Sequence, residues 1–338
     1  MGISAAAASL LWNGLAVSTR DRAGSTVTAY RTFCAFHFGS NVTCFPASGL
    51  QLLEWIGSMS TASRSYHSAK HELSHLRSHH IDLGLSVHGF ECGRVERAIR
   101  GYKKIHGARR TGAKLPITLP LLCRLVAAVD TFAAIPPWDR AVYSAAFTLS
   151  FACFLRSGEV VWDRSTDPAV VLRVSSVEMA SDHAIVTLPA SKTDPFRLGV
   201  KVVAPLVGGP ECPVARLRTI MSKRAASAPL FGLGPSGSDP LTRTAFVATL
   251  RRAIAWAGLA PAAYAGHSFR RGAATWAACL GASPETIQCL GRWNSACFKH
   301  YVDHSASERR NLAVAALFAS REGPLVPDCA SWRDVGAT

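Results

Sequence analysis

Residues 137–159, PWDRAVYSAAFTLSFACFLRSGE, predict a helix at the centre of a folded domain. Pro137 suits the first turn of a helix, and Asp139 complements the positive charge of that helix end. The 15 residues from Ala141 to Leu155 carry no charge and are apolar almost all round, which is typical of a buried helix. Because this run is shorter than the roughly 20 residues that cross a bilayer, we expect no membrane span.

The uncharged run ends at two charged residues, Arg156 and Glu159. Since they are three residues apart, they can share one helix face. An arginine at the edge of a core is partly desolvated and needs an anion close by. Glu159 can supply that anion as a structural ion pair, and a bound phosphate is the second interpretation. These two residues taken alone favour the structural pair.

Positive charge is spread over the whole chain. The 338 residues include 37 Lys and Arg against 22 Asp and Glu, a net charge of +15, and 29 of the 37 are arginine. Residues 1–110 carry +7 and residues 111–338 carry +8. Because arginine matches the geometry of phosphate oxygens, this distribution favours double-stranded DNA as the partner. On charge alone, a basic protein without a nucleic-acid role stays open.

The sequence divides into two domains joined by a basic linker. With 49% hydrophobic residues the chain can build real cores, which excludes a disordered basic tail protein. Apolar positions at helical spacing predict helices at 26–38, 46–59, 63–81 and 93–105. The predicted parts are an N-terminal segment 1–19, an all-α domain 20–106, a linker 107–115 with the sequence GARRTGAKL, a second domain 116–321 and a C-terminal tail 322–338.

The second domain combines helices with a small sheet. Helical patterns at 120–132 and 137–155 are followed by three β-branched runs between 170 and 206, VVLRVSSVEM, HAIVTLPA and GVKVVAPL. Turn residues separate these runs, which predicts a small antiparallel sheet with Lys192 at the tip of its second hairpin. After Pro213 the pattern is helical again. We therefore expect a mainly α protein, all-α in its first domain and mixed α+β in its second.

Neither cysteine nor histidine spacing indicates a metal site. The ten cysteines never form C-x-x-C and most lie in apolar segments, so we expect reduced, buried thiols. His71 and His75 can share a helix face, but no carboxylate or cysteine stands at a matching position. The N-terminus has no basic region before its apolar part, which predicts a soluble intracellular protein.

Two further motifs complete a set of residues suited to phosphoryl transfer. GHSFRRG at 266–272 places a histidine and an arginine three residues apart, and GRWNS and FKHYVDH follow with a tryptophan and a tyrosine. The ordered set is Arg156, Lys192, His267, Arg270, Trp293 and Tyr301. Each residue also has a structural interpretation: Tyr301 as an ordinary half-buried tyrosine on a helix predicted at 295–303, Trp293 as a core residue, and Lys201, on the same hairpin, as a rival to Lys192. Their joint occurrence favours a functional site.

This order and spacing resemble the tyrosine recombinase (phage integrase) family. FLRSGE, GHSFRRG and LGRWNSACFKHY look most like the recombinases of eukaryotic mobile elements, Crypton-like or retroelement-type, including fungal ones. The resemblance covers nearly the whole chain. It implies an all-α, SAM-like core-binding domain followed by an α+β catalytic domain that integrates or excises a mobile element without metal, ATP or another cofactor.

The resemblance also assigns roles to the residues of the set. Tyr301 would be the nucleophile, forming a 3′-phosphotyrosine and releasing a 5′-hydroxyl. Arg156 and Arg270 would clamp the non-bridging oxygens of the phosphate.

The remaining residues of the set would move protons or give support. Lys192 would protonate the leaving oxygen, and His267 would assist proton transfer or bind the phosphate. Trp293 stands where many relatives carry histidine and can donate its indole N–H. Glu159 would support the site.

The predicted partner is double-stranded DNA, bound by a homo-tetramer on paired sites, in the nucleus if the source is eukaryotic. The candidates for further DNA contacts are Arg64, Lys70, Arg77, Arg109, Arg110 and Arg271. The apolar stripe of a predicted helix at 308–319 suggests that it docks on a neighbouring protomer.

Several other functions compete with this one. The loop FGLGPSG contains G-x-G-x-x-G, but a proline lies inside it and no βαβ context surrounds it, which indicates a surface loop. GHSFR has Arg270 where a nucleophile elbow needs glycine, so a hydrolase based on Ser268 is not favoured. A recombinase-derived DNA-binding protein that no longer cleaves and a type IB topoisomerase both stay open.

Overall fold

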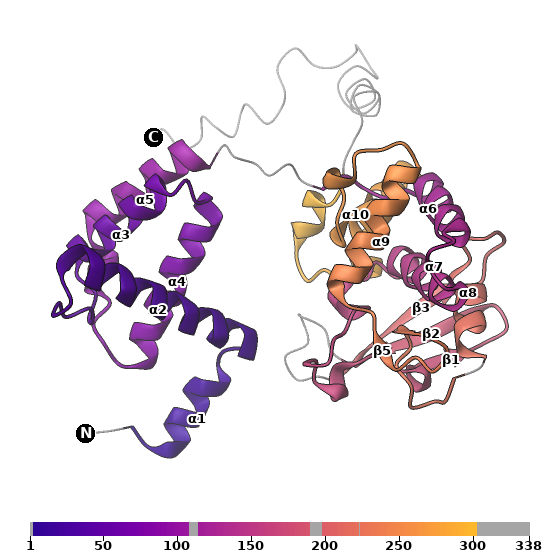
Figure 1. Cartoon of the computed structure of the whole chain (residues 1–338), viewed down its shortest axis with the longest axis horizontal. Helices are drawn as coiled ribbons and strands as arrows, with labels where there is room; N and C mark the ends of the chain where they lie inside the picture. The colour runs from indigo at the N-terminus through magenta and orange to yellow at the C-terminus, as the bar shows by residue number, and fades with distance from the viewer. Residues whose placement is uncertain (1–2, 108–113, 190–197, 223, 303–338) are drawn as a thin grey trace, which may run out of the picture. The chain divides into compact units, whose positions relative to one another are not determined.

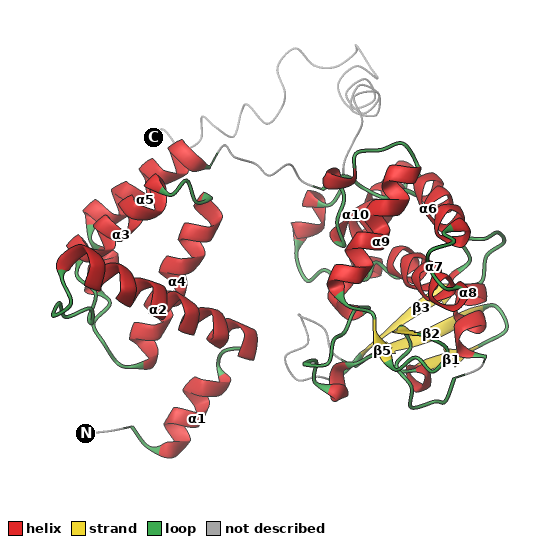
Figure 2. Cartoon of the chain, in the orientation of Figure 1, coloured by secondary structure: helices red, strands yellow, loops and turns green. Residues whose placement is uncertain are grey.

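The computed structural model describes residues 3–107, 114–189, 198–222 and 224–302. The chain folds as two compact units, residues 1–112 and 113–338. Helices dominate both units, and the described strands belong to the second one (Figure 2). The predicted fold class, mainly α with a small antiparallel sheet, is confirmed.

The first unit consists of helices around one apolar core (Figure 1). Its helices are α1 (Ala5–Asn13), α2 (Val17–Phe38), α3 (Gly49–Thr61), α4 (Tyr66–Asp82), the 3-10 helix η1 (His88–Glu91) and α5 (Gly93–His106). Side chains from α2, α3, α4 and α5 meet in the core, among them Tyr30, Leu52, Trp55, Leu76 and Val95.

Three helix starts in the first unit differ from the predicted ones. α4 begins at Tyr66 rather than at residue 63, because Ser65 caps it by accepting from the Ser68 N–H. α3 begins at Gly49 rather than at residue 46, because Ser48 and Gln51 form a capping box in which each side chain binds the other residue's backbone N–H. α2 begins at Val17, nine residues before the predicted start, since Gly24 and its polar neighbours are weak helix formers that obscure the pattern. α1 lies in the segment 1–19, where Ser4 caps it by accepting from the Ala7 N–H.

The second unit combines six α-helices with a small sheet within its described residues. The helices are α6 (Leu119–Thr131), α7 (Pro137–Ala152), α8 (Pro213–Met221), α9 (Arg243–Trp256), α10 (His267–Cys279) and α11 (Pro284–Gly291). The strands are β1 (Val177–Met179), β2 (His183–Leu188) and β3 (Val200–Pro205), with a two-residue pair, β4 (Gly232–Leu233) and β5 (Asp239–Pro240). Helix α7 packs against α6, α8, α10 and β3, and its residues 142–150 are buried, which confirms the predicted central helix.

The end of α7 differs from the prediction. It stops at Ala152 rather than at residue 155, and Phe154 adopts a left-handed conformation with φ of 51°. The chain then forms the 3-10 turn η2 (Ser157–Glu159), with Arg156 as its cap. Arg156 and Glu159 therefore share a short turn that follows α7 instead of the last turn of α7 itself.

The sheet has the antiparallel order β1-β2-β3, and Val186 of β2 pairs with Val177 of β1 and Val202 of β3. The first predicted run is only partly correct, because residues 170–176 belong mostly to the 3-10 turns η3 (Pro168–Val170) and η4 (Val174–Ser176). Their backbone bonds to the segment 226–230 instead of to a neighbouring strand. Among the described helices, none combines the length and the apolar character needed to cross a membrane.

Candidate active site

The candidate site rests on a small apolar cluster of its own. Phe154, from the turn after α7, packs with Ala273 and Ala274 of α10, Ile287 of α11, and the rings of Trp293 and Phe298. Tyr301 lies at the edge of this cluster and follows the 3-10 helix η6 (Ala296–His300). Segments far apart in the sequence therefore meet at one place, and residues of the predicted set lie after α7, on α10 and in the chain that follows α11.

Arg270 is the buried centre of the site. Its side chain is 0% exposed. Nη1 donates to the Phe154 carbonyl oxygen at 2.6 Å, and Nη2 donates to the Gly291 carbonyl oxygen. The guanidinium carbon lies 4.2 Å from the centroid of the Trp293 ring and 5.9 Å from that of the Tyr301 ring. Hydrogen bonds at one edge and aromatic faces nearby hold this cation in a fixed orientation.

The pKa of Arg270 is lowered to about 10. Burial is the main cause, followed by the positive charges of Arg156 and Arg292, whereas Glu159 and Tyr301 act in the opposite direction. Arg270 still carries its charge at neutral pH, in a place where that charge is poorly solvated. An anion that entered the site would be attracted to it.

The Glu159 carboxylate accepts hydrogen bonds from two arginines other than Arg270, namely Arg156 and Arg292. It accepts from Arg156 Nη1 at 3.0 Å and from the Arg156 backbone N–H at 2.9 Å. Arg292 binds the same carboxylate at 3.3 and 2.9 Å through its two terminal nitrogens. Burial alone would raise the pKa of Glu159, but the hydrogen bond and charge of Arg292, with the help of Arg156, lower it overall. The predicted pair of Arg156 and Glu159 is present and is part of a larger cluster.

Acid is expected to weaken the second unit through Glu159. Because the folded-state pKa of this carboxyl is lowered, its contribution to stability is present above the unfolded-state value of 4.5 and is lost as the pH falls through the folded-state value. Urea titrations at neutral pH and below pH 4.5 should therefore show a smaller acid-induced loss of unfolding free energy in Glu159→Gln than in the wild type. Glu178→Gln, at an exposed pair with Lys201, is the control and should behave as the wild type. Equal losses in all three proteins would contradict the prediction.

The turn Gly291-Arg292-Trp293 shapes the site. A Cβ atom on Gly291 would lie 1.7 Å from the Trp293 ring, so only glycine lets the ring fold back over this position. Arg292 is left-handed, with φ of 56° and ψ of 47°, and ends helix α11. The turn therefore places a guanidinium against Glu159 and an indole against Arg270.

Gly291→Ala is expected to lower the free energy of unfolding by about 1–3 kcal/mol or more, because the new methyl group overlaps the Trp293 ring. Denaturant titration followed by tryptophan fluorescence measures this effect. Gly158→Ala is the matched control: nothing lies within 4 Å of the added Cβ, and the change should stay within about 0.5 kcal/mol. A similar stability for both variants would show that the Trp293 ring has room to move.

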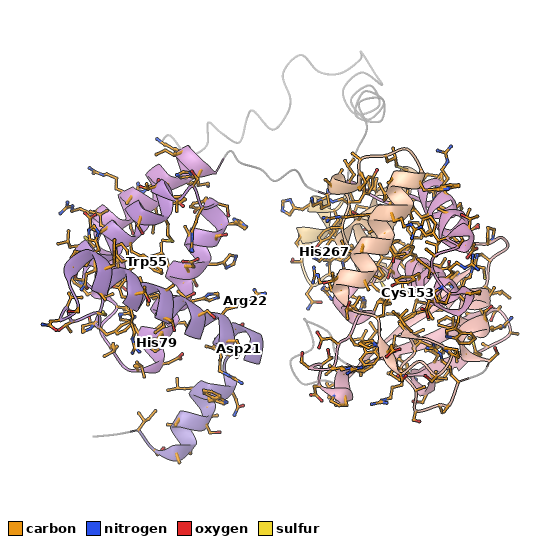
Figure 3. All side chains as sticks on the ribbon, viewed as in Figure 1. Asp21, Arg22, Trp55, His79, Cys153 and His267 are labelled. Atoms are coloured by element: carbon orange, nitrogen blue, oxygen red, sulfur yellow. The ribbon has the colours of Figure 1, made fainter. Side chains whose placement is uncertain are left out.

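His267 and Tyr301 lie on different segments near Arg270 and Trp293. His267 is the first residue of α10, is exposed, and precedes Arg270 by about one helical turn (Figure 3). The preceding Gly266 lies against Ser157 of η2, where an added Cβ would meet the serine side chain at 2.5 Å. The Tyr301 carbonyl accepts from Thr275 Oγ1 of α10 at 3.1 Å, and its ring centroid is 5.2 Å from that of Trp293.

The segment before Tyr301 differs from the predicted helix at 295–303. It forms the 3-10 helix η6, and the Tyr301 N–H donates to the Phe298 carbonyl at 2.8 Å. Lys192 lies outside the described residues, and so do Arg109, Arg110 and the predicted helix at 308–319. Lys201, the rival of Lys192, is exposed on β3 and lies 3.6 Å from Glu178.

Sequence comparisons identify no relative: no protein-family model matches the chain, and no curated protein does. Solved structures with a similar fold include the XerH site-specific recombinase bound to a palindromic difH substrate in a post-cleavage complex. It is 14% identical, with a TM-score of 0.55 over 87% of this chain and 77% of that one. A lambda integrase dimer bound to a COC′ core site is 16% identical, with a TM-score of 0.54 over 93% and 94% of the two chains. The chain has the tyrosine recombinase fold.

A third structure agrees with this assignment. The Tn1549 transposon integrase in complex with a circular intermediate DNA is 14% identical, with a TM-score of 0.52 over 81% of this chain and 87% of that one. At identities this low, the similarity shows a common fold and does not show that individual side chains correspond. What the site does here depends on the contacts of this chain's own residues.

The sequence analysis missed one residue of the cluster, Arg292. The motif LGRWNS places it next to Trp293, which is the residue that the resemblance selects. The available signal was the arginine of this motif, the third at the site after Arg156 and Arg270, but the direction of its side chain depends on the left-handed turn. Trp293 itself is 8% exposed and packs on Arg270.

The predicted DNA contacts differ in their surroundings. Arg64 pairs with Glu72, and Arg77 lies 3.4 Å from Glu91, so carboxylates partly neutralise both. Lys70 is exposed on α4. Arg271 is half-buried, with its guanidinium carbon 5.9 Å from the centroid of the Tyr301 ring.

The structure gives less support to the other groups of residues considered in the sequence, namely the histidine pair, Ser268 and the cysteines. The ring centroids of His71 and His75 lie 6.3 Å apart, and no group of three or more metal-binding side chains occurs in the described ranges. The Ser268 side chain is fully buried and accepts from the Ala265 N–H, which argues against a nucleophile. The expectation of buried thiols is wrong for three exposed cysteines on the outer faces of α10, α11 and η6: Cys279, Cys289 and Cys297.

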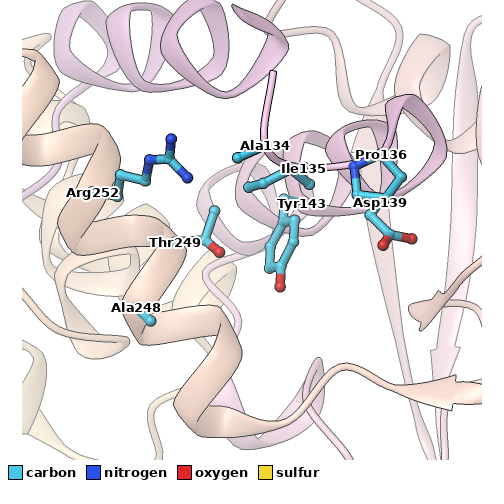
Figure 4. A pocket seen from close by; sticks show the side chains of 8 residues that line it. All are labelled: Ala134, Ile135, Pro136, Asp139, Tyr143, Ala248, Thr249 and Arg252. Carbon is cyan, nitrogen blue, oxygen red and sulfur yellow. The ribbon is translucent and has the colours of Figure 1, made fainter. Parts of the chain in front are cut away.

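A surface pocket of about 350 Å³ is lined by residues outside the cationic cluster, which consists of Arg156, Arg270, Arg292 and the carboxylate of Glu159 (Figure 4). Tyr143 and Asp139 of α7 line one side, and Thr249 and Arg252 of α9 line the other. The arginine packs over the Phe132 ring at 4.4 Å instead of pointing to an anion site. The residues that line this pocket do not include any of the predicted set.

Proposed function

We propose that this protein breaks and rejoins DNA strands at specific sites through a 3′-phosphotyrosine intermediate. The observation that carries the proposal is the buried, charged Arg270, which lies beside the adjoining rings of Trp293 and Tyr301 and in the electrostatic field of Arg156. Burial of a guanidinium against carbonyls and rings carries a desolvation cost, which a bound anion would offset. A DNA phosphate beside a tyrosine hydroxyl is an anion that this arrangement fits.

In the proposed reaction, Tyr301 Oη attacks the phosphorus of a DNA phosphodiester. The Tyr301 hydroxyl gives up its proton with the assistance of His267, and the bond between phosphorus and the 5′-oxygen breaks. The phosphate becomes a 3′-phosphotyrosyl ester, and the leaving oxygen takes a proton from Lys192 to become a 5′-hydroxyl. Since one ester replaces another, attack by a second 5′-hydroxyl rejoins the strand without ATP.

The cationic cluster would stabilise the charge that develops during this step. Arg156 and Arg292 bind the carboxylate of Glu159, and Arg270 lies within the electrostatic influence of all three, so these three arginines and one carboxylate carry a formal excess of two positive charges. The Nε atoms of Arg270 and Arg292 are buried donors without a partner in the described part of the chain. An oxyanion would satisfy such donors. Because Trp293 and Tyr301 cover Arg270, we propose that both side chains move when DNA enters.

Proton transfer is assigned to two residues of the set. We propose that Lys192 protonates the leaving 5′-oxygen and that His267 assists or binds the phosphate. The support for His267 is its exposed place at the start of α10, one turn from Arg270.

We propose a mobile-element context for this activity. The motifs FLRSGE, GHSFRRG and LGRWNSACFKHY support a Crypton-like or retroelement-type recombinase that integrates or excises its element in the nucleus. The first unit would act as the core-binding domain and the second as the catalytic domain. Four protomers would assemble on two sites, with the segment 308–319 docking on a neighbour and with DNA contacts from Lys70, Arg109, Arg110 and Arg271.

Covalent capture tests the proposed function without knowledge of the target site. The full chain is incubated with a pool of nicked duplexes randomised around the nick, protein–DNA adducts are recovered in denaturing detergent, and the DNA is sequenced. We expect a recurring sequence in the captured DNA and a phosphotyrosine at Tyr301 by mass spectrometry. DNA binding without any adduct would favour a binding protein that no longer cleaves, whereas relaxation of supercoils without a preferred site would favour a type IB topoisomerase.

A further inference from the structure

Arg292 occupies a backbone position where an arginine is unusual. It ends α11 in the left-handed region, with φ of 56° and ψ of 47°. Helices commonly end in this conformation with glycine, because a Cβ atom makes it less favourable for other residues. Glycine would therefore form this turn with less strain, so the arginine side chain must contribute something that glycine lacks.

That contribution is a bidentate contact with Glu159. Nη1 and Nη2 of Arg292 donate to Oε1 and Oε2 at 3.3 and 2.9 Å, and the side chains are 14% and 5% exposed. Two parallel hydrogen bonds fix the plane of the carboxylate as well as its position. The same carboxylate accepts from the Arg156 backbone and from Arg156 Nη1. The orientation of Arg156 is therefore coupled to Arg292 through Glu159.

We propose that Arg292 is a positioning residue for strand cleavage: it holds Glu159 in the orientation that directs the Arg156 guanidinium at the scissile phosphate. The inference rests on the proposed function. Arg292 acts through another residue because both of its terminal nitrogens bind the carboxylate. Without it, the Glu159 carboxylate would lose the bidentate contact that fixes its plane, and a rotation toward Arg156 would draw that guanidinium out of line.

The test uses the full-length protein and the duplexes that the wild type captures. One rate and one affinity are measured for each variant: the single-turnover rate of adduct formation at saturating DNA, and the DNA affinity by fluorescence anisotropy. Arg292→Ala is expected to slow adduct formation about 100-fold, the effect of a displacement of about 1 Å at a reacting group, with little change in affinity. Arg292→Lys keeps the charge but not the bidentate contact, and should lose about 10-fold.

A double-variant cycle separates positioning from other roles. If Arg292 acts through Glu159, then Glu159→Gln combined with Arg292→Ala should be no slower than the slower single variant, to within about twofold. Arg216→Ala is the matched control, because it removes a bidentate arginine from Asp130, at 3.2 and 2.7 Å, on α8 and α6. Its rate should equal that of the wild type.

Each outcome decides the inference. A slowed rate at unchanged affinity, without further loss in the double variant, supports it. Wild-type rates in Arg292→Ala overturn it, as do losses that multiply in the double variant or that arise from weaker DNA binding. If the alanine variant fails to fold, Arg292→Lys decides: slowed cleavage at an unchanged melting temperature supports positioning, and the wild-type rate overturns it. Absence of adduct in the wild type would instead refute the proposed function, and this inference with it.

Discussion

Tyr301→Phe is expected to bind DNA with the affinity of the wild type and to form no covalent adduct. Phenylalanine keeps the ring, whose centroid lies 5.2 Å from that of Trp293, and removes only the hydroxyl. The fold and the DNA surface should therefore be unchanged, whereas the proposed nucleophile is gone. Gel electrophoresis in denaturing detergent reports the adduct, and fluorescence anisotropy reports the affinity.

Tyr264→Phe provides the matched control for this experiment. Tyr264 is 5% exposed, lies in the same unit, and precedes His267 by three residues. Its variant should form the adduct at the rate of the wild type. Adduct formation by Tyr301→Phe would show that Tyr301 is not the nucleophile. Loss of the adduct in Tyr264→Phe would indicate Tyr264 instead.

The central helix could be predicted from its long uncharged, apolar run, and the sheet from β-branched runs that are separated by turn residues. Residues 141–155 are uncharged, and the structure buries 142–150 on α7. The end of that helix could not be predicted, since it depends on the left-handed Phe154, and no glycine or proline marks the turn. The predicted first strand is too long, because the backbone of residues 170–176 forms hydrogen bonds with the distant segment 226–230. Local sequence does not reveal such a pairing.

Sequence spacing predicted the pair of Arg156 and Glu159, because residues three apart on one turn lie close together whatever the rest of the fold does. The full burial of Arg270 and the approach of Arg292 could not be predicted in the same way. Both depend on contacts between segments more than 100 residues apart, such as Arg270 with Phe154 and Arg292 with Glu159. Long-range packing of this kind leaves no periodic signal in the chain.

Removal of the Arg270 guanidinium is expected to slow adduct formation by about 10³-fold, the loss that follows when a buried, preorganised charge donor is deleted from a transition-state site. The same change should lower the free energy of unfolding by about 1–3 kcal/mol, because the carbonyls of Phe154 and Gly291 lose their donors. Arg270→Ala is compared with the wild type by single-turnover capture at saturating DNA and by urea titration.

Arg224→Ala separates the two effects of the Arg270 variant. Arg224 is also a partly buried arginine that donates to backbone carbonyls, those of Pro229 and Leu230 at 3.0 and 2.8 Å, but it lies outside the cationic cluster. Its loss should destabilise the same unit by a similar amount and leave the rate of adduct formation unchanged, since the guanidinium does not face the reacting atoms. If both variants slow cleavage equally, Arg270 acts only through stability. If only Arg270→Ala does, its positive charge takes part in the reaction itself.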